Sequence, residues 1–164
     1  MDPVTAEQTS ATTAGPAVGV EDPLALERQV CFALSIASRG VLAVYRPLLE
    51  PMGLTHPQYL VMLALWGTSP LTVKEIGTLL QLDSATLSPL LKRLDAAGYL
   101  TRTRRSDDER LVDVGLTEAG RALRARAELI PPTIVARLGI DIGELQALHA
   151  ALTKLIAAAR AVEA

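Results

Sequence analysis

The sequence predicts a mainly helical fold with one small β-hairpin. Apolar residues make up 49% of the 164 residues, whereas aromatic residues make up only 3%. Aliphatic side chains and alanine must therefore fill the core, which favours packed helices over a β-sandwich or barrel. Apolar residues also recur at helical spacing in several stretches, and two short β-compatible stretches flank a polar tip at residues 106–110.

Two helices are predicted before residue 67. Apolar positions recur at helical spacing from about residue 24 to residue 49, and Pro51 and Gly53 follow the end of this helix. The next helix begins near Pro57, because proline suits a first helical turn, and extends to Trp66. Its residues are apolar on almost every side, so we expect it to lie at the centre of the fold.

A short helix, a tight turn and an amphipathic helix follow. Thr72 and Glu75 form a capping box at the start of the short helix. After the turn, Asp83 is a good N-cap, and Gly98 ends the second helix in the position that a left-handed cap prefers. Leucines at i, i+3, i+4 and i+7 form its buried face. These are Leu87, Leu90, Leu91 and Leu94.

The start of the second helix has two interpretations. If it begins after Asp83, then Pro89 lies inside the helix, removes one hydrogen bond and bends it. Alternatively, Ser88 is the N-cap and Pro89 is the first helical residue. The sequence alone does not decide between them.

The hairpin stretches are residues 99–105 and 111–116. Thr117 then caps a further helix, which the two prolines at residues 131–132 interrupt, and a last helix follows from Asp141. The order helix, helix, short helix, turn, helix and hairpin is that of a winged helix-turn-helix. In that fold the second helix of the pair enters the major groove of DNA.

Hydroxyl and basic side chains gather on this motif. Hydroxyl groups near a helix N-terminus suit contacts to base edges and phosphates, and the helix dipole attracts phosphate. A net charge of −2 excludes a uniformly basic nucleic-acid coat but allows a local basic patch. The alternative is that the arginines only form a solvated face. The candidate DNA-binding residues are Ser84, Thr86, Ser88, Lys92, Arg93, Arg104 and Arg110, with Arg102 and Arg105 nearby on the hairpin.

Several motifs are similar to those of one known family. They are residues 83–94 (DSATLSPLLKRL), 98–102 (GYLTR), 108–110 (DER) and 116–120 (LTEAG). Over roughly residues 24–160 the chain resembles the MarR family of bacterial transcriptional regulators. The resemblance implies a homodimer that binds a palindromic operator in double-stranded DNA. It also implies that Asp108 and Arg110 pair, and that Arg110 enters the minor groove.

We expect one domain at residues 23–164, preceded by a disordered arm at residues 1–22, which are rich in Ala, Thr, Pro and Gly. Within the domain, the DNA-binding lobe covers about 56–116, and the dimer forms from helices at about 24–50 and 117–160. The longest apolar run, residues 59–66, is too short to span a bilayer. Without a secretory signal, this predicts a cytoplasmic protein that uses no membrane.

Cys31 is the only cysteine, which excludes an intramolecular disulfide. A free cysteine is most often a small buried hydrophobe. Its surroundings, however, resemble the OhrR subgroup of MarR proteins, the organic hydroperoxide sensors. The matching residues are 29–34 (QVCFAL), 38–39 (SR), 45–51 (YRPLLEP) and 54–59 (LTHPQY). In that subgroup the cysteine is oxidised to sulfenic acid and the repressor releases its DNA.

The resemblance implies that tyrosines of the partner subunit hydrogen-bond to the cysteine. Tyr45 occupies one such position, whereas Ser35 and His56 stand where the subgroup often has tyrosine. Cys31 and Tyr45 lie on one predicted helix, about 21 Å apart, so they meet only across an antiparallel pair of first helices. The candidate redox-sensing residues are Cys31, Tyr45, His56 and Tyr59. A low-molecular-weight thiol then caps the sulfenic acid, or Cys31 overoxidises.

Other classes of function are weighed against this one. His56 and His149 belong to no nucleophile–base pattern, so we expect no enzyme. One cysteine and two separated histidines predict no metal site, and no cofactor is expected. Two further alternatives remain: a repressor relieved by a small phenolic or aromatic ligand, with Cys31 structural, and a helical dimerisation module, which leaves the basic hairpin unexplained.

Overall fold

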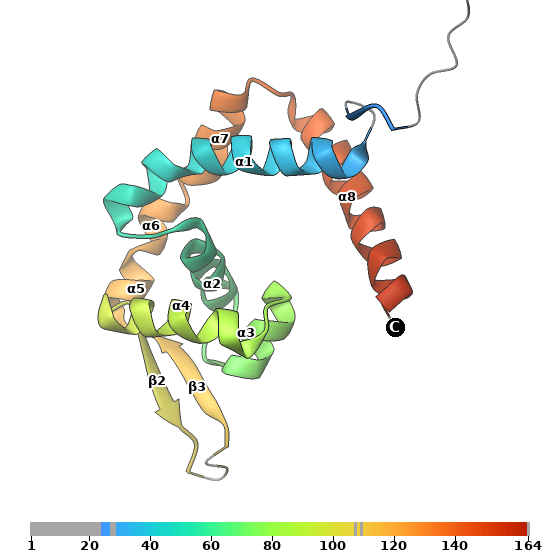
Figure 1. Cartoon of the computed structure of the whole chain (residues 1–164). Coiled ribbons are helices and arrows are strands. Elements are labelled where there is room, and N and C mark those ends of the chain that lie inside the picture. Colours follow the sequence, from blue (N-terminus) through green and yellow to red (C-terminus); the bar gives the residue numbers. More distant parts are fainter. Residues whose placement is uncertain (1–23, 27–28, 107, 109, 164) are drawn as a thin grey trace, which may run out of the picture. The chain divides into compact units, whose positions relative to one another are not determined.

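A computed structural model of the chain describes residues 24–26, 29–106, 108 and 110–163 (Figure 1). The chain divides into two compact units, residues 1–37 and 38–164, with the boundary inside helix α1 (Val30–Leu49). In the first unit, the described residues from Val30 onward are the beginning of this helix. The predicted disordered arm at residues 1–22 lies outside the described residues.

The second unit contains the end of α1 and all the other elements. The helices are η2 (Glu50–Met52), α2 (His56–Gly67), α3 (Val73–Leu80), α4 (Ser84–Ala96), α5 (Glu118–Ala122), α6 (Arg124–Ala127), α7 (Ile130–Leu138) and α8 (Ile142–Glu163). The strands are β1 (Leu71–Thr72), β2 (Leu100–Arg104) and β3 (Val112–Leu116). The predicted mainly helical fold with one hairpin is therefore confirmed.

The hairpin forms most of a three-stranded antiparallel sheet in the order β1-β3-β2. Leu100 pairs with Leu116 at its base, and Arg104 pairs with Val112 near its tip. Strand β1 was not predicted, because it is only two residues long; it pairs Leu71 with Val114. Figure 1 shows the hairpin of β2 and β3 projecting away from α3 and α4. We call residues 100–116 the wing.

Helix α2 lies in the core, as its apolar sequence predicts. Val61, Met62 and Leu65 are at most 1% exposed. They belong to one hydrophobic cluster with Ile76 of α3 and with the leucines of α4. Burial of these side chains fixes the position of α4, the second helix of the helix-turn-helix pair.

Helix α4 begins after Asp83, so the first of the two interpretations is correct. The Asp83 carboxylate accepts the backbone N–H of Thr86 at 2.7 Å, and Pro89 lies inside the helix. The alternative cap, Ser88, is wrong because Ser88 lies inside α4, where its hydroxyl donates to the carbonyl of Ser84 at 2.6 Å. Gly98 has φ +77°, the left-handed conformation predicted for it.

Two predicted helix boundaries are wrong. The first helix begins at Val30 rather than near residue 24, and Leu24 and Leu26 are 83% and 57% exposed. These two leucines, although they continue the apolar spacing, are therefore not part of a buried face. The prolines at residues 131–132 do not interrupt a helix but occupy the first turn of α7, where their missing N–H groups cost nothing.

By length and composition, residues Val30–Met52 form one segment long and apolar enough to cross a membrane, although only 6% of its most apolar window is buried. This contradicts the expectation that no apolar stretch is long enough. The indication is weak, because a helix that packs within a soluble protein passes the same test. An apolar face that is exposed in one chain equally suits a contact with another chain.

Candidate DNA-binding surface and cysteine site

The predicted DNA-binding residues of α4 lie on its outer face. Leu87, Leu91 and Leu94 are at most 1% exposed and turn toward the core. Because α4 is amphipathic, its polar side chains are exposed as expected. These exposed residues are Ser84, Thr86, Ser88, Lys92 and Arg93.

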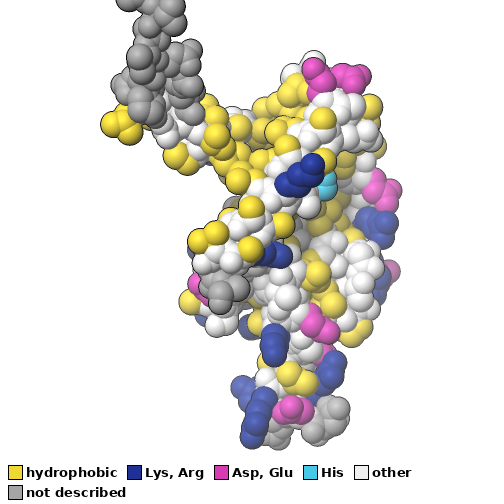
Figure 2. All heavy atoms as spheres, turned by 90° about the vertical axis from the view of Figure 1, so that its right-hand side faces the viewer, with side chains coloured by type: hydrophobic (Ala, Val, Ile, Leu, Met, Phe, Trp, Pro, Cys, Tyr) yellow, Lys and Arg dark blue, Asp and Glu magenta, His cyan; other side chains and the backbone are white. Residues whose placement is uncertain are grey.

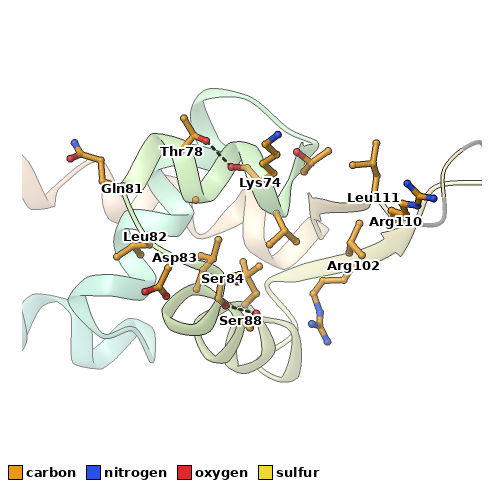
Figure 3. Close-up of a pocket in the computed structure, with 16 residues that line it drawn as sticks. Lys74, Thr78, Gln81, Leu82, Asp83, Ser84, Ser88, Arg102, Arg110 and Leu111 are labelled. Carbon is orange, nitrogen blue, oxygen red and sulfur yellow. Dashed lines mark hydrogen bonds between the residues drawn. The ribbon is translucent and has the colours of Figure 1, made fainter. Parts of the chain in front are cut away.

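A groove of about 840 Å³ lies between α3, α4 and the wing (Figure 3). It brings together three of the predicted residues, Ser84, Ser88 and Arg110. Thr86, Lys92, Arg93, Arg104 and Asp108 do not line it. Its apolar lining includes Val73, Leu87, Leu91, Leu111 and Val112.

Three polar residues that line the groove were missed as DNA-binding candidates, whereas Arg102 of the basic hairpin lines it as well. The three missed residues are Lys74, Thr78 and Gln81. Lys74 and Thr78 lie four residues apart on α3, so they share the exposed face of that helix. The same amphipathic pattern that predicted the buried face of α3 also contained the signal for its polar face.

The groove is positively charged. Lys74, Arg102 and Arg110 contribute cations, whereas Asp83 is the only acidic side chain among the described residues that line it. The hydrogen bond from the backbone N–H of Thr86 lowers the pKa of Asp83, so its carboxylate stays ionised as the cap of α4. Figure 2 shows Lys and Arg side chains gathered at the end of the molecule formed by the wing.

Two ion pairs involve arginines of the wing. The Nε atom of Arg102 lies 3.0 Å from the Asp95 carboxylate at the end of α4, and that of Arg105 lies 2.9 Å from Asp113 across the hairpin. Both pairs are partly exposed, so their main effect is to orient the wing rather than to stabilise the fold. The first pair connects α4 directly to β2.

Near the tip of the wing, Asp108 accepts the backbone N–H of Arg110 at 3.0 Å. This is a contact to the backbone of Arg110, and no ion pair between the two side chains is found among the described residues, so their pairing stays a prediction. Both side chains are exposed. Because this hydrogen bond uses the backbone N–H of Arg110, the exposed guanidinium group remains available for a ligand.

Three of the four candidate redox-sensing residues meet in one ring cluster. The rings of Tyr45 and His56 are arranged edge to face, with their centroids 5.1 Å apart. The centroid of the Tyr59 ring lies 6.1 Å from that of Tyr45 and 6.4 Å from that of His56. Tyr59 is only 3% exposed and also contacts Trp66 at 6.3 Å. It therefore supports the cluster from within the core, whereas Tyr45 and His56 are half-buried.

Burial controls the charge of this cluster. It raises the pKa of Tyr45 and Tyr59 and lowers the pKa of His56. All three rings are therefore neutral at pH 7, and the tyrosine hydroxyls keep their protons for donation. The lowered pKa also disfavours a positive charge on His56 in mildly acid solution.

Cys31 lies in the first turn of α1 and is exposed within the described chain. This exposure argues against the interpretation of Cys31 as a small buried hydrophobic residue. Ser35, one turn later, donates its hydroxyl to the backbone carbonyl of Cys31 at 2.9 Å. The Ser35 hydroxyl is thus directed to the helix backbone.

Several known proteins are similar to this chain in sequence and in fold. The family described as transcriptional regulator SarA/Rot matches residues 43–126. The organic hydroperoxide resistance transcriptional regulator of Bacillus subtilis is 44% identical over 82% of this chain and 92% of its own length. The chain belongs to the MarR family of transcriptional regulators, in its OhrR subgroup.

Further relatives agree with that assignment. The HTH-type transcriptional regulator TtmR of Methylorubrum extorquens is 46% identical over 79% of this chain and 67% of its own length. The structure of reduced AbfR bound to DNA, a protein of Staphylococcus epidermidis, has a TM-score of 0.75 and 32% identity, covering 85% of this chain and 95% of that one. Overoxidised AbfR bound to DNA gives a TM-score of 0.67 and 33% identity over 80% of this chain and 92% of that one.

The helix-turn-helix of this MarR-type regulator is formed by α3 and α4, and its wing by β2 and β3. We call α4 the recognition helix. The chain is a regulator rather than an enzyme, as the absence of a nucleophile–base pattern predicted. Among the described residues, no group of three or more His, Cys, Asp and Glu side chains is placed to bind a metal ion.

Proposed function

We propose that the chain is a homodimeric repressor that binds a palindromic operator and releases it when an organic hydroperoxide oxidises Cys31. The observation that carries this proposal is the exposed Cys31 of α1, in a chain that also has a basic helix-turn-helix and wing. Such a regulator acts on chromosomal DNA and therefore works in the cytoplasm.

The DNA contacts follow from the exposed side chains. The recognition helix enters the major groove, where Ser84, Thr86 and Ser88 approach base edges and Lys92 and Arg93 approach phosphates. The wing reaches the adjacent minor groove with Arg110, while Arg104 contacts the backbone and Asp108 holds the turn that presents Arg110. These roles are specific to double-stranded DNA, because a helix does not fit the deep, narrow major groove of RNA.

Exposed apolar side chains support the homodimer. On α8, Ile142, Leu148 and Val162 are 63%, 52% and 88% exposed. Val30 and Ile36 of α1 are 65% and 46% exposed. Large apolar side chains that repeat along a helix mark an interface rather than a solvated surface. We assign dimerisation to residues 24–50 and 117–160, and the DNA-binding lobe to residues 56–116 of a single domain at 23–164.

The chemistry at Cys31 is a two-electron oxidation. The thiolate attacks one peroxide oxygen, an S–O bond forms as the O–O bond breaks, and the alkoxide takes a proton and leaves as an alcohol. The sulfenic acid then condenses with a low-molecular-weight thiol, which forms a mixed disulfide and releases water, or it is overoxidised. Either product adds bulk and polarity at a packed interface.

Tyr45 and His56 have a role in this step. In an antiparallel pair of α1 helices, the partner's Tyr45 donates its hydroxyl to the thiolate or the sulfenate of Cys31. His56 contacts Tyr45 and is neutral, so it holds the ring in place without adding charge. Tyr59 packs beneath both rings. Bulk added at Cys31 then displaces this cluster, which sits on α1 and α2, and changes the spacing of the two recognition helices.

The proposal is tested by gel shift with DNA from upstream of the protein's own gene. The full-length protein should shift this DNA, one equivalent of cumene hydroperoxide should abolish the shift, and dithiothreitol should restore it. The Cys31→Ser protein should bind equally well and ignore the oxidant. This variant keeps all three methionines, so it separates cysteine oxidation from methionine oxidation. Release of DNA by oxidised Cys31→Ser protein would overturn the mechanism.

A second candidate function is relief by a small phenolic or aromatic ligand. A cavity of about 290 Å³, lined by Tyr59, Leu63, Trp66 and Arg124 among others, favours it. The same gel shift decides between the two candidates. If a phenolic ligand relieves repression, phenolic acids should release the DNA from wild-type and Cys31→Ser protein alike. A shift that responds to the hydroperoxide alone excludes this candidate.

A further inference from the structure

We infer that the groove between α3, α4 and the wing holds one sugar–phosphate strand of the operator, and that Lys74 and Gln81 contact this strand from α3 and its C-terminal end. The inference rests on the proposed DNA-binding function. It adds two contacts that lie outside both the recognition helix and the wing.

The position of the groove follows from the geometry of a DNA duplex. One sugar–phosphate strand always separates a major groove from the adjacent minor groove. If α4 occupies the major groove and the wing the adjacent minor groove, then that strand must lie between them. The space between them is the groove of about 840 Å³, into which Ser84 and Ser88 of the recognition helix face (Figure 3).

The charge of the groove fits a polyanion. Lys74 on α3 stands across from Arg102 and Arg110 on the wing side, so cations line the groove from both sides (Figure 3). The carboxylate of Asp83 is occupied by the backbone N–H of Thr86. The whole chain carries a net charge of −2, so this local excess of positive charge is not a general property of its surface.

Gln81 provides an independent observation. Its backbone is left-handed, with φ 54° and ψ 42°, and it is the only non-glycine residue with positive φ among the described residues. Glycine adopts this conformation without cost, whereas a side chain makes it unfavourable. Gln81 closes α3 through its backbone N–H, a bond that glycine would also make. The glutamine side chain is therefore retained for something other than the turn.

The side chain of Gln81 is exposed at the end of the groove opposite the wing (Figure 3). An uncharged amide donates hydrogen bonds to phosphate oxygens whatever the base sequence. A residue held in an unfavourable conformation at a binding surface is a common sign of a functional constraint. We infer that Gln81 and Lys74 contact the same strand at different phosphates, one with an amide and one with a charge.

The first test separates binding from stability. In the full-length protein, Gln81→Gly should raise Tm by about 1–4 °C, because it relieves the left-handed backbone. The same variant should weaken operator binding by about 3- to 10-fold, because a hydrogen bond to a charged group is lost. Thr68→Ala, which removes an exposed polar side chain at the end of α2, outside the groove lining and outside the residues assigned to dimerisation, should change operator binding by less than 2-fold. A merely structural role for Gln81 would change Tm and leave binding unaltered.

The second test uses the salt dependence of binding. Each phosphate contact contributes about 0.9 to the slope of log K against log salt concentration, so Lys74→Gln should reduce the slope by about 2 in a dimer. Lys154→Gln removes the same charge from α8, outside the groove, and should leave the slope unchanged once light scattering shows that the variant has the same dimer mass as wild type. If wild-type protein binds no upstream DNA, the proposed function fails. If it binds, while Gln81→Gly leaves affinity and Lys74→Gln leaves slope unchanged, only this inference is overturned.

Discussion

Gly120 in α5 packs directly against the backbone carbonyl of Tyr99, with no room for a Cβ atom between them. Thr117 completes the contact. Its backbone N–H donates to the carbonyl of Tyr99 at 3.1 Å, and its hydroxyl donates to that of Gly98 at 2.7 Å. Thr117 and Gly120, which follow the wing, therefore contact the backbone of the residues that precede it, and these contacts fix the wing relative to α5.

The Gly120→Ala substitution should consequently destabilise the protein. The added methyl group forces the backbones of α5 and Tyr99 apart, and overpacking of this kind costs about 1–3 kcal/mol of the free energy of unfolding. Urea unfolding followed by circular dichroism measures the loss. Gly67→Ala is the matched control, because a Cβ at Gly67 meets nothing within 4 Å, and it should be neutral or slightly stabilising. Equal midpoints for both variants would contradict the close packing.

Trp66→Phe should weaken the same region by a different route. The indole Nε1 of Trp66 donates to the carbonyl of Gly120 at 2.9 Å, and phenylalanine keeps the ring packing but not the donor. Loss of this bond should lower the free energy of unfolding by about 0.5–1.5 kcal/mol. Trp66 is the only tryptophan, so unfolding of the variant must be followed by circular dichroism. An unchanged urea midpoint would show that the bond does not contribute to stability.

His56 makes stability depend on pH near neutrality. Burial lowers its pKa in the folded protein below the ordinary value of 6.5, so the unfolded chain binds this proton more readily. Stability should therefore be full above about pH 6.5 and should fall as the pH decreases toward the folded pKa. In His56→Gln this fall should be smaller, as measured by Tm between pH 5 and 8. His149→Gln controls for the loss of one histidine, and an equal effect of both variants would argue against His56.

Much of the fold was predictable because its signals are local. Thr72, Asp83 and Thr117 all cap the helices that the sequence predicts, and each accepts a backbone N–H from three residues later. A cap depends on residues within one helical turn, so a single sequence contains it. The amphipathic pattern of α4 likewise placed its leucines in the core and its polar residues outside.

The rest depends on contacts between distant residues. Strand β1 exists only because Leu71 pairs with Val114, and two residues are too short to show alternation. The left-handed backbone of Gln81 could not be predicted from the sequence, because glycine is the usual residue in that conformation. In the candidate site, the resemblance to OhrR proteins pointed to Tyr45 and His56, but packing between α1 and α2 is what brings their rings together.

Acid should unfold the helix-turn-helix through two caps. Hydrogen bonds from the hydroxyl and the backbone N–H of Thr72 lower the pKa of Glu75 below its ordinary value of 4.5, and the Thr86 N–H lowers that of Asp83 below 3.8. Because both folded pKa values are depressed, the stabilisation is complete above the ordinary values and is lost as the pH falls through the folded ones.

The double variant Asp83→Asn, Glu75→Gln isolates this contribution. Asparagine caps a helix about as well as aspartate, and glutamine retains an acceptor for Thr72, so stability at pH 7 should change little. Below pH 4.5, however, the Tm of the variant should fall less steeply than that of wild type, because neither cap titrates any longer. Glu118→Gln, in the first turn of α5, controls for the loss of a negative charge. If the double variant loses stability in acid as steeply as wild type, then the acid response arises from other carboxylates and the two caps are not its origin.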